Sequence, residues 1–226
     1  MLLGNLLKSV NDKYEKIPVK GMSSDSRKIK KKYVFFAIKG KKTSGSKFIK
    51  EAILKGASAI VVSNKSSVNN CEIPLVKVKD VRKAFSETCS NFYKKKPKNI
   101  IAVTGTNGKS SVADFFYQIL NYNRIPVASI GTLGIKSKSY KKKTNLTSMD
   151  PLDLHKNLEE IAKRNVRNVI LEASSHGLIQ KRLDNLNINT GIFTNFSHDH
   201  LDYHKNMQSY LDAKMYLFKS LLKKKS

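Results

Sequence analysis

Short apolar runs alternate with longer segments of helical periodicity along most of this chain. The apolar runs are rich in Val, Ile and Phe, which is typical of strands that are buried on both faces. The longer segments place apolar residues at the spacing of an amphipathic helix. In the first part of the chain this pattern predicts strands over 33–38, 58–63 and 74–78 and helices over 46–56 and 81–96.

The alternation continues after a segment of lysines and one proline, 94–99, which we interpret as a linker. Such an alternation implies a mainly parallel sheet that is covered by helices on both faces. We therefore expect an α/β protein with two domains, residues 1–97 and 98–226. In the second domain the pattern predicts strands over 99–105, 126–131, 168–174 and 190–196 and a helix over 110–123.

Glycine-containing and polar segments follow four of the predicted strands. In parallel sheets the ligands bind at the carboxyl ends of the strands, where such segments meet. We expect the functional residues of the second domain to lie in these segments, which are 105–111, 131–134, 172–176 and 194–200.

The charge of the chain raises the question of nucleic acid. The 226 residues carry a formal net charge of +26, and 40% of them are hydrophobic, which is enough for real cores. Nearly all of the positive charge comes from scattered lysines, whereas readout of base edges favours arginine. The composition therefore disfavours nucleic acid as a partner and favours a solvated lysine surface that attracts anionic ligands.

The compartment is indicated by what the sequence lacks. The N-terminal stretch M-L-L-G-N-L-L-K has no long apolar signal region, and no stretch approaches the length of a membrane span. Cys71 and Cys89 have neither metal-type spacing nor an obvious pairing role. We expect a cytoplasmic protein with no membrane partner.

The stretch V-T-G-T-N-G-K-S-S at 103–111 lies between a predicted strand and a predicted helix. Glycines let the backbone approach an anion closely, and successive N–H groups at a helix start can hold phosphates. Lys109 would reach the outer phosphates and the Ser110 hydroxyl would bind Mg²⁺. The alternative is a glycine turn with an unrelated lysine. We expect ATP to bind to Gly105, Thr106, Asn107, Gly108, Lys109, Ser110 and Ser111.

Acidic and histidine residues follow two other strands. Glu172 ends one strand, and the segment 193–204, F-T-N-F-S-H-D-H-L-D-Y-H, follows another. Carboxylate and imidazole groups near a phosphate loop suit a divalent metal ion. The alternative is that His198, His200 and His204 are exposed loop histidines.

One lysine near the end of the chain lies on an apolar face. Read as a helix, S-Y-L-D-A-K-M-Y-L-F at 209–218 aligns Lys214 with Tyr210, Leu217 and Phe218. An unpaired ammonium group there would lose hydration, unless the side chain extends to water.

These stretches also carry a family resemblance. T-G-T-N-G-K-S resembles the loop of the Mur ligases and of their relative folylpolyglutamate synthetase. E-A-S-S-H-G-L, the histidine segment and Y-L-D-A-K-M-Y-L-F resemble the MurE branch, the UDP-N-acetylmuramoyl-tripeptide synthetases. The resemblance implies a ligase of peptidoglycan synthesis, and hence of cell wall biogenesis, cell shape and cell division. Such an enzyme phosphorylates a carboxylate with ATP, and an amine then attacks the acyl phosphate.

The resemblance also assigns roles to residues. It implies that Lys214 is carbamylated by CO₂ and joins Glu172 and His200 at a second Mg²⁺, while Ser110 serves the first. Burial favours the neutral amine that takes up CO₂. The catalytic residues implied are Lys109, His200 and Lys214.

The substrate implied is UDP-MurNAc-L-Ala-D-Glu, to which meso-diaminopimelate or L-lysine is added. The segment 21–29, with S-S-D-S-R, and the loop 37–45 resemble uridine-contacting segments of an N-terminal UDP-MurNAc-binding domain. The segment 146–155, L-T-S-M-D-P-L-D-L-H, and S-S-H-G-L-I-Q-K-R resemble muropeptide-binding segments. The substrate contacts implied are Ser24, Ser26, Lys41, Lys42, Thr43, Thr147, Ser148, Ser174, Gln180 and Arg182.

The chain departs from the family pattern in places. Ser44, Gly45 and Ser46 replace an Asp-Gly-aromatic pattern, and Met149 replaces a proline. Enzymes of the MurE branch have three domains, so this chain resembles an inactive fragment with an incomplete P-loop central domain and a missing C-terminal portion. We then expect the last helix, about 207–222, to expose an apolar face. The alternatives are a folylpolyglutamate synthetase-like ligase and a non-catalytic, basic nucleotide- or nucleic-acid-binding remnant.

Overall fold

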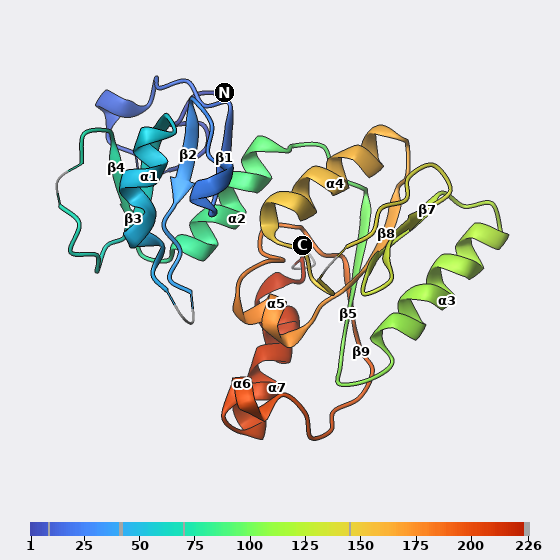
Figure 1. The fold of residues 1–226 in the computed structure, drawn as a ribbon. Helices are drawn as coiled ribbons and strands as arrows, with labels where there is room; N and C mark the ends of the chain where they lie inside the picture. Colours follow the sequence, from blue (N-terminus) through green and yellow to red (C-terminus); the bar gives the residue numbers. More distant parts are fainter. Residues whose placement is uncertain (9, 41–42, 70, 145, 224–226) are drawn as a thin grey trace. The chain divides into compact units, whose positions relative to one another are not determined.

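The chain divides into two compact units, Met1–Phe92 and Tyr93–Ser226 (Figure 1). The computed structural model describes residues 1–8, 10–40, 43–69, 71–144 and 146–223. The division comes at the end of a helix, just before the lysine- and proline-containing segment. None of the helices in the described part of the chain combines the length and the apolar character that a membrane span needs.

The first unit is built on a parallel sheet. Its described strands run in the spatial order β1-β2-β3-β4. Phe35 packs with the residues of α1, whereas the ring of Phe36 lies 4.9 Å from that of Phe85 in α2, so helices cover both faces. The elements are η1 (Asp12–Tyr14), β1 (Gly21–Ser23), η2 (Ser26–Lys28), β2 (Tyr33–Phe36), η3 (Gly45–Phe48), α1 (Ile49–Leu54), β3 (Ala57–Ser63), β4 (Leu75–Val78) and α2 (Val81–Phe92).

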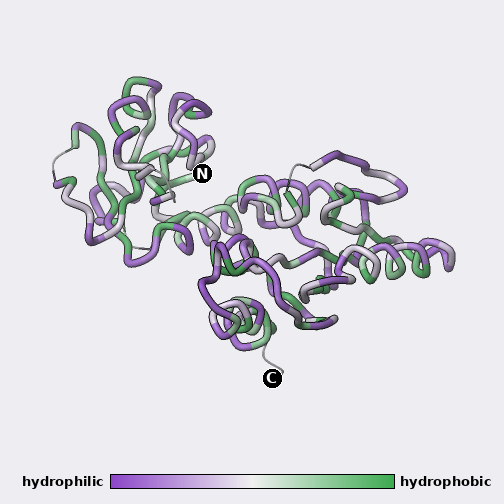
Figure 2. The backbone as a smooth tube through the Cα atoms, turned by 60° about the horizontal axis from the view of Figure 1, so that its bottom comes forward, coloured by the Kyte–Doolittle hydropathy of each residue, from purple (hydrophilic) through white to green (hydrophobic). Residues whose placement is uncertain are grey.

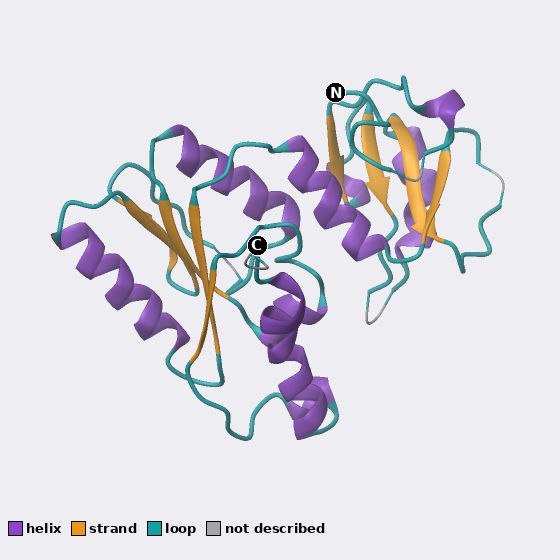
Figure 3. Cartoon of the chain, turned by 180° about the vertical axis from the view of Figure 1, so that it is seen from behind, coloured by secondary structure: helices purple, strands orange, loops and turns teal. Residues whose placement is uncertain are grey.

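The second unit has a mixed sheet that lies between helices (Figures 1 and 3). Its described strands run in the order β7-β6-β8-β5-β9, and all neighbours are parallel except β6 and β7. Ile170 packs with residues of α3, whereas Val169 and Leu171 face the cluster that contains α4. The strands are β5 (Asn99–Thr104), β6 (Val127–Gly131), β7 (Gly134–Ser137), β8 (Asn168–Glu172) and β9 (Thr190–Phe193).

Helices and turns complete this unit. They are α3 (Lys109–Tyr122), α4 (Pro151–Lys163), α5 (Ser175–Ile179), α6 (Leu201–His204), α7 (Met207–Tyr216) and η4 (Leu217–Leu221). The helix predicted over 81–96 ends earlier than expected, at Phe92. Lys96 already belongs to the second unit, where its amine donates to the carbonyl of Asn185.

The expected exposure of the last helix is wrong. Tyr210 and Leu217 are only 1% and 0% exposed, because α7 packs against α5 and η4 joins the main core of the unit. The ring of Phe218 lies 6.1 Å from that of Phe193, over Gly191, where a side chain would collide with it. The α-helix ends at Tyr216 and continues as a π-helical turn.

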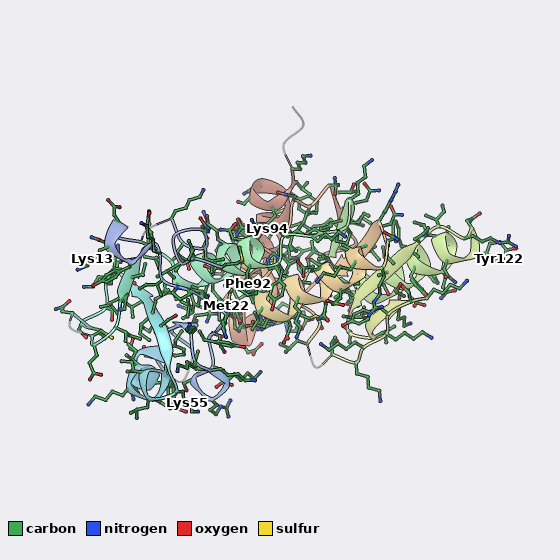
Figure 4. The ribbon with its side chains drawn as sticks, turned by 90° about the horizontal axis from the view of Figure 1, so that it is seen from above. Lys13, Met22, Lys55, Phe92, Lys94 and Tyr122 are labelled. Atoms are coloured by element: carbon green, nitrogen blue, oxygen red, sulfur yellow. The ribbon has the colours of Figure 1, made fainter. Side chains whose placement is uncertain are left out.

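Large apolar side chains are exposed on α3 instead. Phe115, Ile119 and Tyr122, which we call the α3 stripe, are 61%, 61% and 88% exposed. Green and purple segments alternate along this helix in Figure 2, and Tyr122 projects from its outer end in Figure 4. The edges of the sheet among the described strands are β7 and β9. The buried side of α3 is held by Ala113.

Candidate active site

Residues 105–111, which we call the phosphate loop, connect β5 to the first turn of α3, as the sequence predicts. Gly105 and Gly108 have φ angles of +147° and +81°, which L-residues with side chains rarely adopt. A side chain at Gly105 would also collide with the hydroxyl of Thr194. The backbone of this loop therefore depends on glycine at both positions, and the loop leads directly into the N-terminus of α3, where unpaired N–H groups attract anions.

A cavity of about 280 Å³ lies over this loop, at the carboxyl ends of the strands. It brings together the predicted nucleotide-binding residues and the predicted metal-binding residues, although the two groups are distant in sequence. The lining residues are Gly105, Thr106, Asn107, Gly108, Lys109, Ser110, Ser111, Thr132, Thr147, Glu172, Ser174, Ser175, His200, Tyr210 and Lys214.

Glu172 ends β8 and is only 3% exposed. One carboxylate oxygen accepts from the backbone N–H of Thr132 at 3.0 Å. The other accepts from the hydroxyl of Ser110 at 2.9 Å and from that of Thr132 at 3.1 Å. Gly131 makes room for this arrangement, because a side chain there would overlap the carboxylate. The hydrogen bonds hold the carboxylate at the start of α3, beside the phosphate loop.

Two lysines converge on one carbonyl group of the loop. The amine of Lys109 donates to the carbonyls of Gly105 and Thr106 at 3.0 and 2.7 Å. The amine of Lys214 donates to the same Gly105 carbonyl at 2.6 Å. Burial lowers the pKa of Lys109, and Glu172 opposes that shift. Two ammonium groups at one carbonyl form a site that an anion would stabilise.

Lys214 does not extend to water. It is 1% exposed, and burial, together with the charge of Lys109, lowers its pKa to about 8. The amine also lies 4.2 Å from the ring centre of Tyr210. Burial excludes the alternative in which this side chain reaches solvent. The lowered pKa also raises the fraction of neutral amine, although the ammonium form still predominates at pH 7.

The histidines differ in their surroundings. His200 lines the cavity with a side chain that is 47% exposed, at a φ of +52°. His204 is 3% exposed and its Nε2 lies 2.9 Å from the hydroxyl of Ser175, so it is part of the packed interior. His198 is exposed outside the cavity. The alternative of exposed loop histidines therefore describes His198, agrees with the exposure of His200, and is wrong for His204.

The oxygens of Ser110 and Glu172 lie together and suit a hard divalent cation. His200 and Lys214 line the same cavity, but the Lys214 amine donates to the Gly105 carbonyl. Within the described ranges, no three His, Cys, Asp or Glu side chains are grouped closely enough to hold a metal ion. As an ammonium group Lys214 cannot bind a metal, whereas an anionic derivative of it could.

The five predicted muropeptide contacts form one hydrogen-bonded network in this unit. The Ser148 hydroxyl lies 3.0 Å from that of Ser174 and also bonds to the carbonyl of Glu172. Arg182 donates to the Ser148 carbonyl at 2.6 Å and to the Gln180 side chain at 2.7 Å. The hydroxyl of Thr147 lies 3.0 Å from that of Thr132, which connects Thr147 to the network through Glu172. The guanidinium of Arg182 is therefore held by protein acceptors.

The predicted uridine-binding residues lie in the first unit. Ser24 and Ser26 follow β1, and the loop with Thr43 follows β2, so both follow carboxyl ends of neighbouring parallel strands. The Ser26 hydroxyl donates to Glu51 at 2.6 Å, and Thr43 is exposed. Lys41 and Lys42 lie outside the described residues.

Comparison with known families accounts for both units. Residues 103–226 match the Mur ligase middle domain, and residues 18–93 match the Mur ligase family, catalytic domain. The first of these matches covers more than half of the chain. The chain belongs to the Mur ligase family.

Three proteins similar to this Mur ligase chain carry the name UDP-N-acetylmuramoyl-L-alanyl-D-glutamate–2,6-diaminopimelate ligase. The protein of Brucella melitensis is 41% identical over 208 residues, which are 92% of this chain and 43% of the relative. That of Rickettsia montanensis is 44% identical over 209 residues, 91% of this chain and 43% of the relative. A solved structure with that name is 30% identical, with a TM-score of 0.83, over 97% of this chain and 45% of the other. The chain thus spans less than half the length of these relatives.

Residues that sequence reasoning missed also shape the site of this Mur ligase. Thr132 gives Glu172 two hydrogen bonds, and Thr194 donates to the carbonyl of Asn107 at 2.6 Å. Both residues lie in the predicted segments 131–134 and 194–200, but neither was assigned a role of its own. Tyr210 was named only as part of an apolar face, yet it lines the cavity.

Proposed function

We propose that this chain carries the nucleotide-binding and UDP-sugar-binding parts of an ATP-dependent acid–amino-acid ligase. The reaction is the addition of a diamino acid to UDP-MurNAc-L-Ala-D-Glu in peptidoglycan synthesis, in the cytoplasm. The names of the relatives favour 2,6-diaminopimelate over lysine as the incoming amino acid. The absence of a membrane-type helix in the described residues is compatible with this assignment.

The observation that supports this proposal most is the cavity where the phosphate loop meets Glu172 and Lys214. ATP fits this place because the loop amides, the start of α3 and Lys109 all attract phosphate oxygens. In the free protein Lys109 donates to the Gly105 and Thr106 carbonyls. On binding, we expect the Lys109 amine to exchange these two acceptors for phosphate oxygens, which carry more negative charge.

Mg²⁺ would be held by Ser110 and Glu172, and by His200 and a carbamylated Lys214 at a second position. A bound Mg²⁺ supplies charge neutralisation for the triphosphate and the substrate carboxylate. The carbamate would form when the neutral Lys214 amine attacks CO₂ and loses a proton, which leaves an anion beside the Lys109 ammonium group.

The substrate carboxylate would be bound beside the Ser148–Ser174 network, which lies between Glu172 and Arg182. The protein's contribution at this step is orientation, because holding a carboxylate next to the terminal phosphate lowers the entropic part of the barrier. An acyl phosphate formed there could be attacked by an amine. The uridine end of the substrate would be bound in the first unit, by Ser24, Ser26, Lys41, Lys42 and Thr43. The two functional domains would correspond to residues 1–97 and 98–226.

Two measurements on the chain itself test this proposal. Calorimetric titration should show binding of ATP that strengthens when Mg²⁺ is added. A ¹³C NMR spectrum recorded in ¹³C-labelled bicarbonate should show a carbamate resonance that is lost in Lys214→Met and kept in the control Lys156→Met, whose lysine is an exposed residue of α4. Absence of ATP binding would contradict the nucleotide assignment, and a carbamate signal that persists in Lys214→Met would contradict the role of Lys214.

A further inference from the structure

Tyr210 in α7 is buried beneath the phosphate loop. It is 1% exposed, and its hydroxyl donates to the Thr106 hydroxyl at 3.3 Å. The two residues are 104 positions apart along the chain. A buried tyrosine usually satisfies its hydroxyl, but this one does so on a residue of the phosphate loop itself.

The Thr106 hydroxyl is a junction of three segments. It donates to the Ser197 carbonyl at 3.2 Å and accepts from the Ser197 N–H at 3.0 Å, in addition to its bond with Tyr210. Since a hydroxyl has one proton and two lone pairs, its capacity is filled. Thr106 is 7% exposed, so these bonds are shielded from water.

A second bond from the same helix holds the neighbouring loop residue. The Lys214 amine lies one helical turn after Tyr210, 4.2 Å from its ring centre, and donates to the Gly105 carbonyl. The helix α7 therefore contacts two consecutive residues of the phosphate loop. Because Gly105 has a positive φ and lacks a side chain, its conformation is restrained by such outside contacts rather than by its own sterics.

We propose that Tyr210 is a positioning residue, which holds the phosphate loop in its nucleotide-binding conformation through Thr106. The inference rests on the proposed binding of ATP at this loop. The Tyr210 hydroxyl then contributes to nucleotide affinity indirectly, by holding the loop to which the nucleotide binds. The ring has a separate role, since it forms the surface on which the Lys214 side chain lies.

The test separates the hydroxyl from the ring and from general stability. Tyr210→Phe removes the hydroxyl and keeps the ring. Tyr216→Phe is the matched control, because Tyr216 is also in α7 and its hydroxyl donates to Asp184 at 2.9 Å, away from the loop. Thr106→Val removes the partner hydroxyl, whereas Thr106→Ser keeps it.

Two readouts are needed, one with nucleotide and one without. We expect Tyr210→Phe to weaken binding of Mg-ATP by about 3- to 10-fold, as one lost hydrogen bond implies, and Tyr216→Phe to change it by less than about twofold. Thr106→Val should also weaken binding of Mg-ATP, whereas Thr106→Ser should bind Mg-ATP as the wild type does. The Tyr210→Phe/Thr106→Val double variant should bind Mg-ATP no more weakly than Thr106→Val alone. In the free protein, the ¹H–¹⁵N resonances of Gly105 and Gly108 should shift in Tyr210→Phe and stay in place in Tyr216→Phe.

These outcomes distinguish the inference from the function on which it rests. If the wild-type chain does not bind Mg-ATP, the proposed function fails, and the loop resonances still decide whether Tyr210 positions the loop. If the wild type binds but Tyr210→Phe matches Tyr216→Phe in affinity and in the loop resonances, Tyr210 is an ordinary core residue. Additive losses in the double variant would equally overturn a role exerted through Thr106.

Discussion

The two units use the same edge of a parallel sheet in different ways. In the second unit the segments after β5, β6, β8 and β9 converge on one cavity, where the side chains of Ser110 and Thr132 both donate to the carboxylate of Glu172 at the end of β8. In the first unit the segments after β1 and β2 lie beside each other, but Ser26 is bonded to Glu51 and Thr43 is exposed. Shared topology places candidate residues together, whereas buried and mutually bonded polar groups are what make a site chemically specific.

The largest effect that separates the two units is expected from Lys109→Ala. The variant loses one cation and its charge-assisted bonds to phosphate, so ATP affinity should fall by about 100-fold. Binding of UDP, which we assign to the first unit, should not change. Calorimetry with each nucleotide measures both effects, and Lys156→Ala serves as the control for loss of an exposed lysine. Equal loss of UDP binding would show that the two nucleotide sites are not separate.

A second test concerns the stability cost of the buried Lys214. Its pKa falls from 10.5 to about 8 on folding, so between these values the unfolded chain binds more protons than the folded chain. The unfolding free energy of the wild type should therefore rise with pH over this range, by about 3 kcal/mol relative to Lys214→Met. Urea denaturation at several pH values in CO₂-free buffer measures the difference. A flat difference between pH 7 and 10 would mean that the lysine is not desolvated.

Glu172→Gln tests whether the carboxylate holds a cation. The amide retains the shape of the side chain and one oxygen that can accept from Thr132, but it removes the negative charge. We expect the Mg²⁺ dependence of ATP binding to weaken by about 10-fold, with little change in affinity for ATP without metal. Titrations with and without Mg²⁺ give both values, and an unchanged response to Mg²⁺ would assign Glu172 a purely structural role.

The smallest effect is expected in the first unit. Ser26→Ala removes the hydroxyl that donates to Glu51. If Ser26 contacts the uridine end of the substrate, UDP affinity should fall about threefold, as the loss of a single hydrogen bond implies. A fall in Tm of a few degrees with no change in UDP affinity would instead place Ser26 among the structural residues and sharpen the difference between the units.

Local patterns predicted most of this architecture. The predicted strands 58–63 and 99–105 correspond closely to β3 and β5. Short apolar runs of β-branched residues between turns rarely form anything other than a buried strand. The strand β7, with the sequence G-I-K-S, was not predicted because it is short and pairs antiparallel with β6. Its existence depends on a neighbour that periodicity does not reveal.

The candidate site was predicted to a similar extent. The glycines of the phosphate loop and Glu172 were singled out because their types and positions carry a chemical reason, whereas a role for Lys214 came from the family resemblance. The bond between Tyr210 and Thr106 was not, since nothing local to either residue records a partner so far along the chain. The burial of Leu217 was missed for the same reason, because it depends on a tertiary contact.

The α3 stripe has a consequence for the protein in solution. The net charge of +26 makes copies of the chain repel one another over roughly 10 Å at 0.1 M salt, whereas three exposed apolar side chains attract only at contact. At 1 M salt the repulsion reaches only about 3 Å. Charge then no longer keeps the β9 edge of one copy of the chain away from the β9 edge of another copy. Colloidal stability should therefore decrease as ionic strength rises, and concentrated stocks should be kept in dilute buffer.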